Sequence, residues 1–139
     1  MKINKEYIFV KKADINEGLT SGTVSKAAVY FTKDYFFVIP FDSIHIWDSS
    51  KTDFNNAKEF IEDLNTRGEQ ISVEEFQNTC IDFLPNERVY KVDALEKFSM
   101  QVGFLIFGGM RMKKPGEQVQ VANIQPKSVR ARIKAFYGL

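Results

Sequence analysis

Hydrophobic positions recur with a period of two in the first third of the chain and with a period of 3.6 after it, which predicts strands followed by helices. Runs of β-branched and aromatic residues predict strands at 6–13, 23–32 and 35–40. Only Lys33 and Asp34 separate the last two, so 23–40 is predicted to form a hairpin. Pro40 lacks a backbone N–H, so the third strand should end there or lie at a sheet edge. The alternation at 42–47 predicts a short fourth strand.

Residues 53–84 follow the helical period and predict two amphipathic helices. Gly68 suits the position that follows the first helix. Ser72 and Glu75 have the spacing of a capping box at the start of the second helix. We expect the two helices to form an αα-hairpin inserted between strands.

Strands return at 88–92 and in Phe98–Asn123, which is predicted to be the central hairpin of the sheet. The most apolar run of the protein, Val102–Phe107, is expected to be buried in the core. Residues 114–117 read Lys-Pro-Gly-Glu and fit a type II turn, because proline presets φ and glycine accepts a positive φ. The tip of this hairpin, Arg111–Glu117, is basic.

A final helix is predicted at 126–139, with Pro126 in or near its first turn. Its apolar and basic residues are expected on separate faces. They are Val129, Ile133 and Phe136 on one face, and Lys127, Arg130 and Lys134 on the other.

The length of 139 residues indicates one domain, and 44% hydrophobic residues are ample for a core. The order of strands, helices at 53–84, strands and a helix at 126–139 predicts an α+β fold with a mostly antiparallel sheet. The N-terminus lacks the pattern of a signal peptide. The longest apolar stretch, Val102–Met110, is about half of the ~20 residues that a membrane helix needs. We therefore expect a cytoplasmic protein.

Three stretches resemble the bacterial pleckstrin-homology-like (PH-like) and GRAM-like domains. They are the hairpin from Gly22 to Phe37, the hairpin from Val102 to Val121, and the helix from Pro126 to Leu139. The resemblance implies a partly open barrel of about seven strands with a C-terminal helix, into which 53–84 is an insertion. In eukaryotic PH domains, phosphoinositides bind basic residues spaced Lys-x(n)-Lys/Arg-x-Arg. Lys11 and Lys12 fit the first half of that pattern, but Ala27 and Ala28 follow Lys26, which argues against phosphoinositide binding.

The net charge of +1 conceals an uneven distribution of charge. Residues 42–87 carry eleven acidic and three basic residues, a net charge of −8. Residues 108–139 carry seven basic residues and one acidic residue, a net charge of +6. This asymmetry is interpreted either as a device that steers a partner or as two segments that pack together and partly cancel.

Residue types that could perform chemistry occur without partners at suitable spacing. His45 is the only histidine, and no second ligand at metal spacing accompanies it. Cys80, the only cysteine, lies on an apolar helix stripe, as expected of a buried side chain. The carboxylates Glu59, Glu62 and Asp63 fit a solvated helix face. We therefore expect no catalytic residue, no metal and no cofactor.

Basic residues are the candidate binding site. An anionic ligand is predicted to bind at two basic groups, which are Lys11 and Lys12 together with Arg111, Lys113 and Lys114. The near-zero net charge argues against a protein that binds a nucleic-acid backbone.

The leading hypothesis is a non-catalytic binding or scaffolding module that engages a protein partner or an anionic surface. One alternative is an immunity or inhibitor protein whose acidic helices at 53–84 mask a basic partner. The other is a small-ligand enzyme with a pocket between the helices and the sheet, lined by Tyr30, Trp47 or Tyr90.

Overall fold

The computed structural model describes seven stretches of the chain. They are 7–17, 24–43, 54–68, 70–84, 86–104, 107–114 and 117–139. The predicted strand at 42–47 falls mostly outside them, as do His45 and Trp47. Asp42 and Ser43, which are described, continue the preceding strand.

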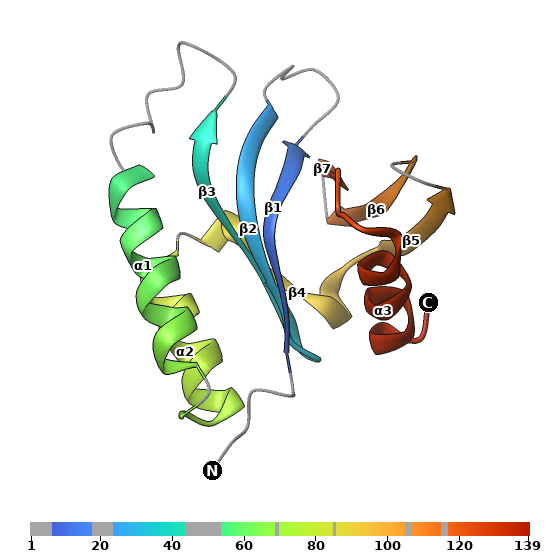
Figure 1. The fold of residues 1–139 in the computed structure, drawn as a ribbon. Helices are drawn as coiled ribbons and strands as arrows, with labels where there is room; N and C mark the ends of the chain where they lie inside the picture. Colours follow the sequence, from blue (N-terminus) through green and yellow to red (C-terminus); the bar gives the residue numbers. More distant parts are fainter. Residues whose placement is uncertain are drawn as a thin grey trace.

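The fold is α+β, as predicted, with a seven-stranded antiparallel sheet in the order β4-β3-β2-β1-β7-β6-β5 (Figure 1). The strands are β1 (Ile8–Glu17), β2 (Val24–Phe31), β3 (Tyr35–Ser43), β4 (Val89–Lys91), β5 (Lys97–Phe104), β6 (Phe107–Lys114) and β7 (Glu117–Ala122). The helices are α1 (Phe54–Arg67), α2 (Val73–Phe83) and α3 (Lys127–Tyr137), with single 3₁₀ turns at Asn86–Arg88 and Val92–Ala94. Within the described residues, the two edge strands β4 and β5 do not pair, so the sheet is not closed.

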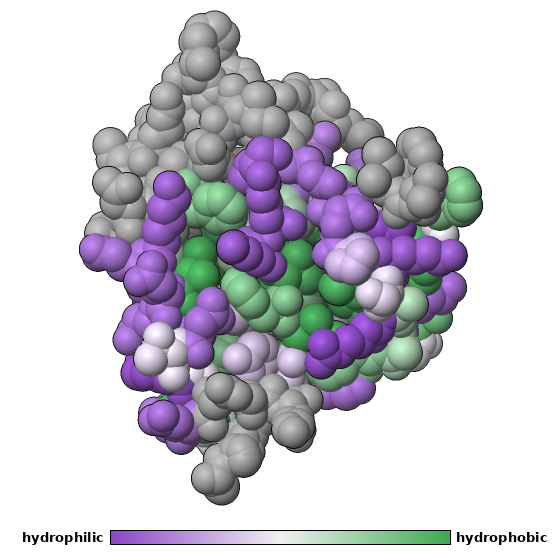
Figure 2. All heavy atoms as spheres, in the orientation of Figure 1, coloured by the Kyte–Doolittle hydropathy of each residue, from purple (hydrophilic) through white to green (hydrophobic). Residues whose placement is uncertain are grey.

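The strands β2 and β3 are apolar on both faces because both faces are covered. The inner face contributes Val29, Phe31, Phe36 and Val38 to a core shared with β1, β6, β7 and α3. The outer face contributes Tyr30, Phe37 and Ile39 to a second core, with α1 and α2. In Figure 1 the helices α1 and α2 lie on one side of these strands and α3 on the other. Figure 2, in the same view, shows apolar side chains gathered between the two groups of helices.

Helix α2 begins as its sequence predicts, since the Ser72 hydroxyl accepts a hydrogen bond from the Glu75 N–H at 3.1 Å. Gly68 follows α1, also as predicted. Glycine often occupies this position because it accepts a left-handed φ, but Gly68 does not have a positive φ and is required for another reason. A Cβ atom at Gly68 would stand 2.8 Å from the Leu64 carbonyl oxygen and 3.0 Å from the Tyr7 hydroxyl. Close packing therefore requires glycine at this position.

Strand β3 continues past Pro40 and lies between β4 and β2, so, contrary to the sequence prediction, it neither ends at this residue nor is an edge strand. Pro40 pairs with Ala27 and Asp42 pairs with Lys26, so Phe41 is an extra residue in a bulge. On its other side β3 pairs with β4 over Tyr35–Phe37, and no described strand continues this pairing to Pro40. The missing N–H therefore costs no ladder hydrogen bond.

The hairpin predicted at Phe98–Asn123 is confirmed in part: β6 and β7 pair antiparallel as far as Lys114 and Glu117, on either side of the predicted turn, whose residues 115 and 116 lie outside the described stretches. The apolar part before it is not one continuous strand with β6, because β5 ends at Phe104 and β6 begins at Phe107. The run Val102–Phe107 was expected in the core, but it spans the end of β5 and the start of β6, where Val102 is only partly buried and Phe104 is 65% exposed. Leu105, Ile106 and the side chain of Phe107 lie outside the described part of the structure. Gly103 and Gly108 have φ of +67° and +146°, values that favour glycine, on either side of this reversal. A chain reversal at the sheet rim exposes apolar residues that a straight strand would bury.

Candidate functional site

The strands β5, β6 and β7 alternate between buried and outward-facing residues, which produces a polar outer face. Met100, Met110, Met112, Val119 and Val121 are buried in the inner core. The residues between them point outward. In the register, Lys97 pairs with Lys113 and Lys113 with Gln118, while Ser99 pairs with Arg111, Arg111 with Gln120, and Gln120 with Asn16.

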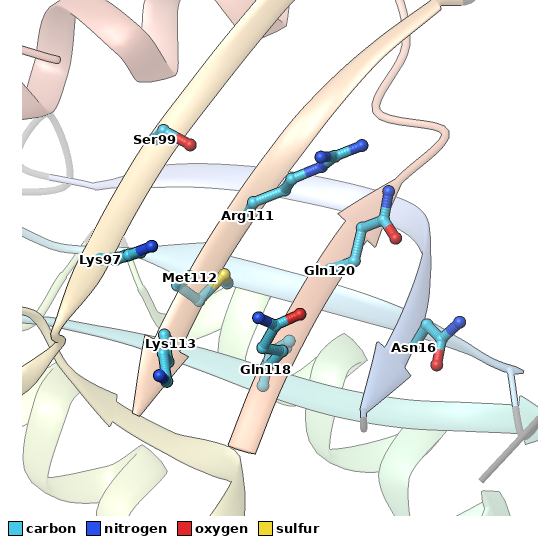
Figure 3. A pocket seen from close by; sticks show the side chains of 9 residues that line it. Asn16, Lys97, Ser99, Arg111, Met112, Lys113, Gln118 and Gln120 are labelled. Atoms are coloured by element: carbon cyan, nitrogen blue, oxygen red, sulfur yellow. The ribbon is translucent and has the colours of Figure 1, made fainter. Parts of the chain in front are cut away.

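This outer face is hollowed, with a volume of about 520 Å³ (Figure 3). The hollow is lined by Asn16, Lys97, Ser99, Arg111, Met112, Lys113, Gln118, Val119 and Gln120, and we call it the polar hollow. Figure 3 shows its side chains along four adjacent strands, β5, β6, β7 and β1. Met112 and Val119 also line it, but they are almost completely buried and their side chains belong to the inner core, so the exposed lining residues are all polar.

Among the described residues, three cations and no carboxylate line the polar hollow. Lys97 stands directly opposite Lys113, a placement of like charges that destabilises a strand pair. The Glu96 carboxylate lies 3.9 Å from the Lys113 ammonium group, and both side chains are nearly half exposed, so water screens this pair. The nearby Asp14 is already paired with Lys26 at 2.7 Å. The hollow therefore keeps an excess of positive charge.

Asn16 lies at the β1 end of the polar hollow. Its side-chain Oδ1 is buried and accepts no hydrogen bond from any described residue. Because water cannot reach this atom, Asn16 offers a ligand no acceptor through Oδ1. The groups that a ligand can reach in the hollow are mainly donors.

The predicted basic site divides in the structure. Arg111 and Lys113 lie together in the polar hollow. Lys11 and Lys12 are exposed in the irregular part of β1 and do not line the hollow. Lys12 is four residues from Asn16, or roughly 13 Å along a strand. Lys114 is the last residue of β6, and its side chain lies outside the described part of the structure.

Lys97 belongs to the polar hollow, although the sequence alone did not identify it as a candidate binding residue. It lies sixteen residues before Lys113, and only the pairing of β5 with β6 places it opposite that residue. The sequence carried one signal, which is the alternation of Lys97, Ser99 and Gln101 with apolar residues. The register could not be counted from the turn, because it shifts between Gln101 and Phe104.

Arg130 does not belong to a basic face of α3, which corrects the sequence prediction. Its side chain is completely buried. The Nε atom donates to the Val102 carbonyl oxygen at 2.6 Å, and Nη1 donates to the Ile124 carbonyl oxygen at 2.7 Å. A Cβ atom at Gly108 would stand 2.8 Å from Nε, so this glycine makes room for the guanidinium group. Arg130 thus attaches α3 to the end of β5.

Cys80 is buried, as predicted, and desolvation raises the pKa of its thiol from an ordinary value of 9.0 to about 12. The thiol stays protonated at neutral pH and is a poor nucleophile. Glu59, Glu62 and Asp63 are exposed on α1, also as predicted. Asp63 pairs with Arg67 at 2.9 Å on the same helix.

Tyr30 and Tyr90, two of the residues expected around an enzyme pocket, are both buried but in different cores. Tyr30 donates a hydrogen bond to the Asn65 side-chain oxygen at 2.7 Å, and burial raises the pKa of its hydroxyl. The two tyrosines therefore give no shared pocket between the helices and the sheet.

The acidic helices leave the polar hollow uncovered. Outside the helices themselves, α1 and α2 pack against Tyr7, Phe9 and side chains of β2, β3 and β4, and no residue of β5, β6 or β7 belongs to that core. The outer face of the sheet is thus divided into an apolar half under α1 and α2 and a polar half at the hollow.

Among the described residues, no helix is long and apolar enough to cross a membrane. The same residues contain no group of three His, Cys, Asp or Glu side chains that could hold a metal ion. Comparisons with protein-family models, with curated proteins and with solved structures found no match. The function is therefore inferred from the polar hollow and its surroundings.

Proposed function

We propose that the protein is a non-catalytic binding module whose ligand surface is the polar hollow on β5, β6 and β7. The observation that carries this proposal is the placement of Lys97, Arg111 and Lys113 in adjacent register positions, with no carboxylate among the described lining residues. The ligand is an anionic group, either on a partner protein or on another molecule.

A second hollow, of about 310 Å³, provides a useful contrast. It is lined by Lys33, Lys91, Asp34, Asp93, Tyr35 and Val92. Its two lysines and two aspartates balance, so it has no preference for one sign of charge. An excess of positive charge therefore distinguishes the polar hollow from this one.

A PH-like or GRAM-like architecture, with an αα-hairpin inserted before β4, is part of the same proposal. It is supported by the succession of three antiparallel strands, two helices, four further strands and a closing helix. It is also supported by the pairing of β1 with both β2 and β7, which joins the two groups of strands. Covering one half of the outer face with the inserted helices would leave the other half available for binding.

The test uses a triple variant, Lys97→Gln/Arg111→Gln/Lys113→Gln, in which neutral side chains replace the three cations of the polar hollow. We call it the charge-neutral variant. Its matched control is Lys127→Gln/Arg132→Gln/Lys134→Gln, which removes three charges from exposed positions of α3. The immobilised proteins are incubated with extract of the source cells and with anionic vesicles. Wild type and control should retain a ligand that the charge-neutral variant loses. Equal retention by all three proteins, or retention of nothing, would contradict the proposal.

A second candidate function is the masking of a basic partner by the acidic helices. It is favoured by six exposed carboxylates on α1 and α2, which are Glu59, Glu62, Asp63, Glu74, Glu75 and Asp82. The same capture experiment separates the two functions. This second function would be favoured if the charge-neutral variant still captured a protein from the extract that the variant Glu59→Gln/Glu62→Gln no longer captured.

A further inference from the structure

The polar hollow offers an unusual density of hydrogen-bond donors. All seven outward side chains that line it can donate a hydrogen bond, and three of them are cations. Lysine and arginine cannot accept a hydrogen bond, so the cationic centre matches a ligand rich in acceptors and negative charge.

The spacing of the three cations is fixed by the sheet. Lys97 and Lys113 are directly opposite each other, so their Cβ atoms stand about 4.5–5.5 Å apart. Arg111 and Lys113 are two residues apart on one strand, which is about 6.6 Å. Three charges within this distance can contact one phosphate group or two linked ones. The planar fork of Arg111 can donate to two oxygen atoms of the same phosphate.

The lining also argues against other polyanions. The described residues that line the polar hollow include no aromatic ring, so they provide no stacking surface of the kind on which proteins bind single-stranded nucleic acid. Its volume of about 520 Å³ lies within the range of small-molecule sites. A compact ligand therefore fits better than an extended chain.

Resting on the proposed function, we infer that the polar hollow binds a compact ligand with more than one negative charge on phosphate, held by Lys97, Arg111 and Lys113. Such a group occurs on soluble phosphorylated molecules and on lipid headgroups that end in a phosphate monoester. Both sources present the same chemistry to the hollow.

The experiment titrates the whole protein with inorganic triphosphate at low salt, with heat of binding and backbone amide shifts as readouts. We expect binding to shift amides of β5, β6 and β7. Arg111→Gln and Lys113→Gln should each weaken it about tenfold to a hundredfold, because each removes a charge-assisted contact. Lys127→Gln/Lys134→Gln should bind as the wild type does. Circular dichroism and thermal unfolding verify that each variant is folded.

Arg111→Lys provides a second variant that preserves the charge and removes the fork. It should bind triphosphate more weakly than wild type and more tightly than Arg111→Gln. Equal binding by Arg111→Lys and Arg111→Gln would show that the positive charge at this position makes no contribution and would count against the inference.

Vesicles distinguish the two sources of phosphate. Sedimentation with phosphatidic acid vesicles, compared with phosphatidylcholine vesicles, tests the headgroup. Binding of triphosphate without sedimentation on phosphatidic acid vesicles assigns a soluble ligand, and sedimentation on phosphatidic acid vesicles assigns a headgroup. The inference is overturned by failure of both, by equal affinity for the tricarboxylate citrate, or by exclusive binding of an oligonucleotide.

The two proposals fail separately. If the charge-neutral variant loses a ligand from cell extract while no phosphate compound binds, the inference fails and the binding function stands. If that variant retains the extract ligand, the binding function itself fails at this surface.

Discussion

At the scale of single residues, Arg130 shows that a basic residue can serve the structure of the protein instead of contributing charge to its surface. Its charge contributes to the +6 of residues 108–139, yet its side chain is completely buried and bound to backbone carbonyl groups. Arg130 is therefore not available to an outside partner, although the sequence counts it among the basic residues of this segment. Arg130 also contributes to the need for glycine at position 108, where a Cβ atom would stand 2.5 Å and 2.6 Å from the Gln101 and Val102 carbonyl oxygens and 2.8 Å from Arg130 Nε.

Replacing Arg130 by methionine should lower the free energy of unfolding by about 2–4 kcal/mol. The substitution preserves much of the side-chain volume but leaves the Val102 and Ile124 carbonyl groups without their charged donor. Urea denaturation measures the change. The control is Arg132→Met on the exposed face of the same helix, expected within about 0.5 kcal/mol of wild type. Equal stability of the two variants would contradict a structural role for Arg130.

At the scale of elements, Thr32 joins three of them at the turn between β2 and β3. Its hydroxyl donates to the Tyr35 carbonyl oxygen and accepts from the Gln77 side chain of α2, each at 2.9 Å. Its carbonyl oxygen accepts from the Tyr137 hydroxyl of α3 at 2.6 Å, and burial raises the pKa of that hydroxyl. Helices from the two sides of the sheet are thus bound to one buried residue.

Thr32→Val should destabilise the protein by about 1–3 kcal/mol, because valine fills the same space but leaves the buried Gln77 amide without its acceptor. The double variant Thr32→Val/Gln77→Leu should recover part of this loss, since it removes both partners. Thr79→Val is the control, because that hydroxyl bonds only to the Glu75 carbonyl of its own helix turn at 2.8 Å. Additive effects of the Thr32 and Gln77 substitutions in thermal unfolding would contradict the coupling.

Elements were predicted well where hydrophobic period and capping residues agree. The helices α1, α2 and α3 and the hairpin of β2 and β3 follow from such local signals. The apolar run Val102–Phe107 was wrongly predicted to be one buried strand segment, because hydrophobicity does not reveal where the chain reverses between β5 and β6. The polar hollow was half predicted: Arg111 and Lys113 are close in sequence, whereas Lys97 joins them through a register that depends on tertiary structure.

At the scale of the whole molecule, burial is concentrated in one half of the sheet. Strands β2 and β3 are covered on both faces, and β2 also pairs with a strand on each side. Strands β5, β6 and β7 are covered on their inner face and carry the polar hollow on the outer one. The half that is covered on both faces thus adjoins a half whose outer face carries the polar hollow.

Amide hydrogen exchange should reflect this division. The amides of Ala28–Phe31 in β2 should exchange slowest, at a rate set by global unfolding, because opening them exposes two cores. Those of β5, an edge strand that pairs with β6, should exchange faster. The measurement is mass spectrometry of peptides after timed deuteration. Protection of β5 equal to that of β2 would contradict the prediction.

The attachment of Tyr137 to Thr32 has a practical consequence for work with this protein. It fixes the last turn of α3 on the inner side of the sheet, beside the turn between β2 and β3. A tag, fluorophore or solid support joined after Leu139 would therefore leave from the face that does not carry the polar hollow. Immobilisation through this end would keep Lys97, Arg111 and Lys113 open to solution during binding measurements.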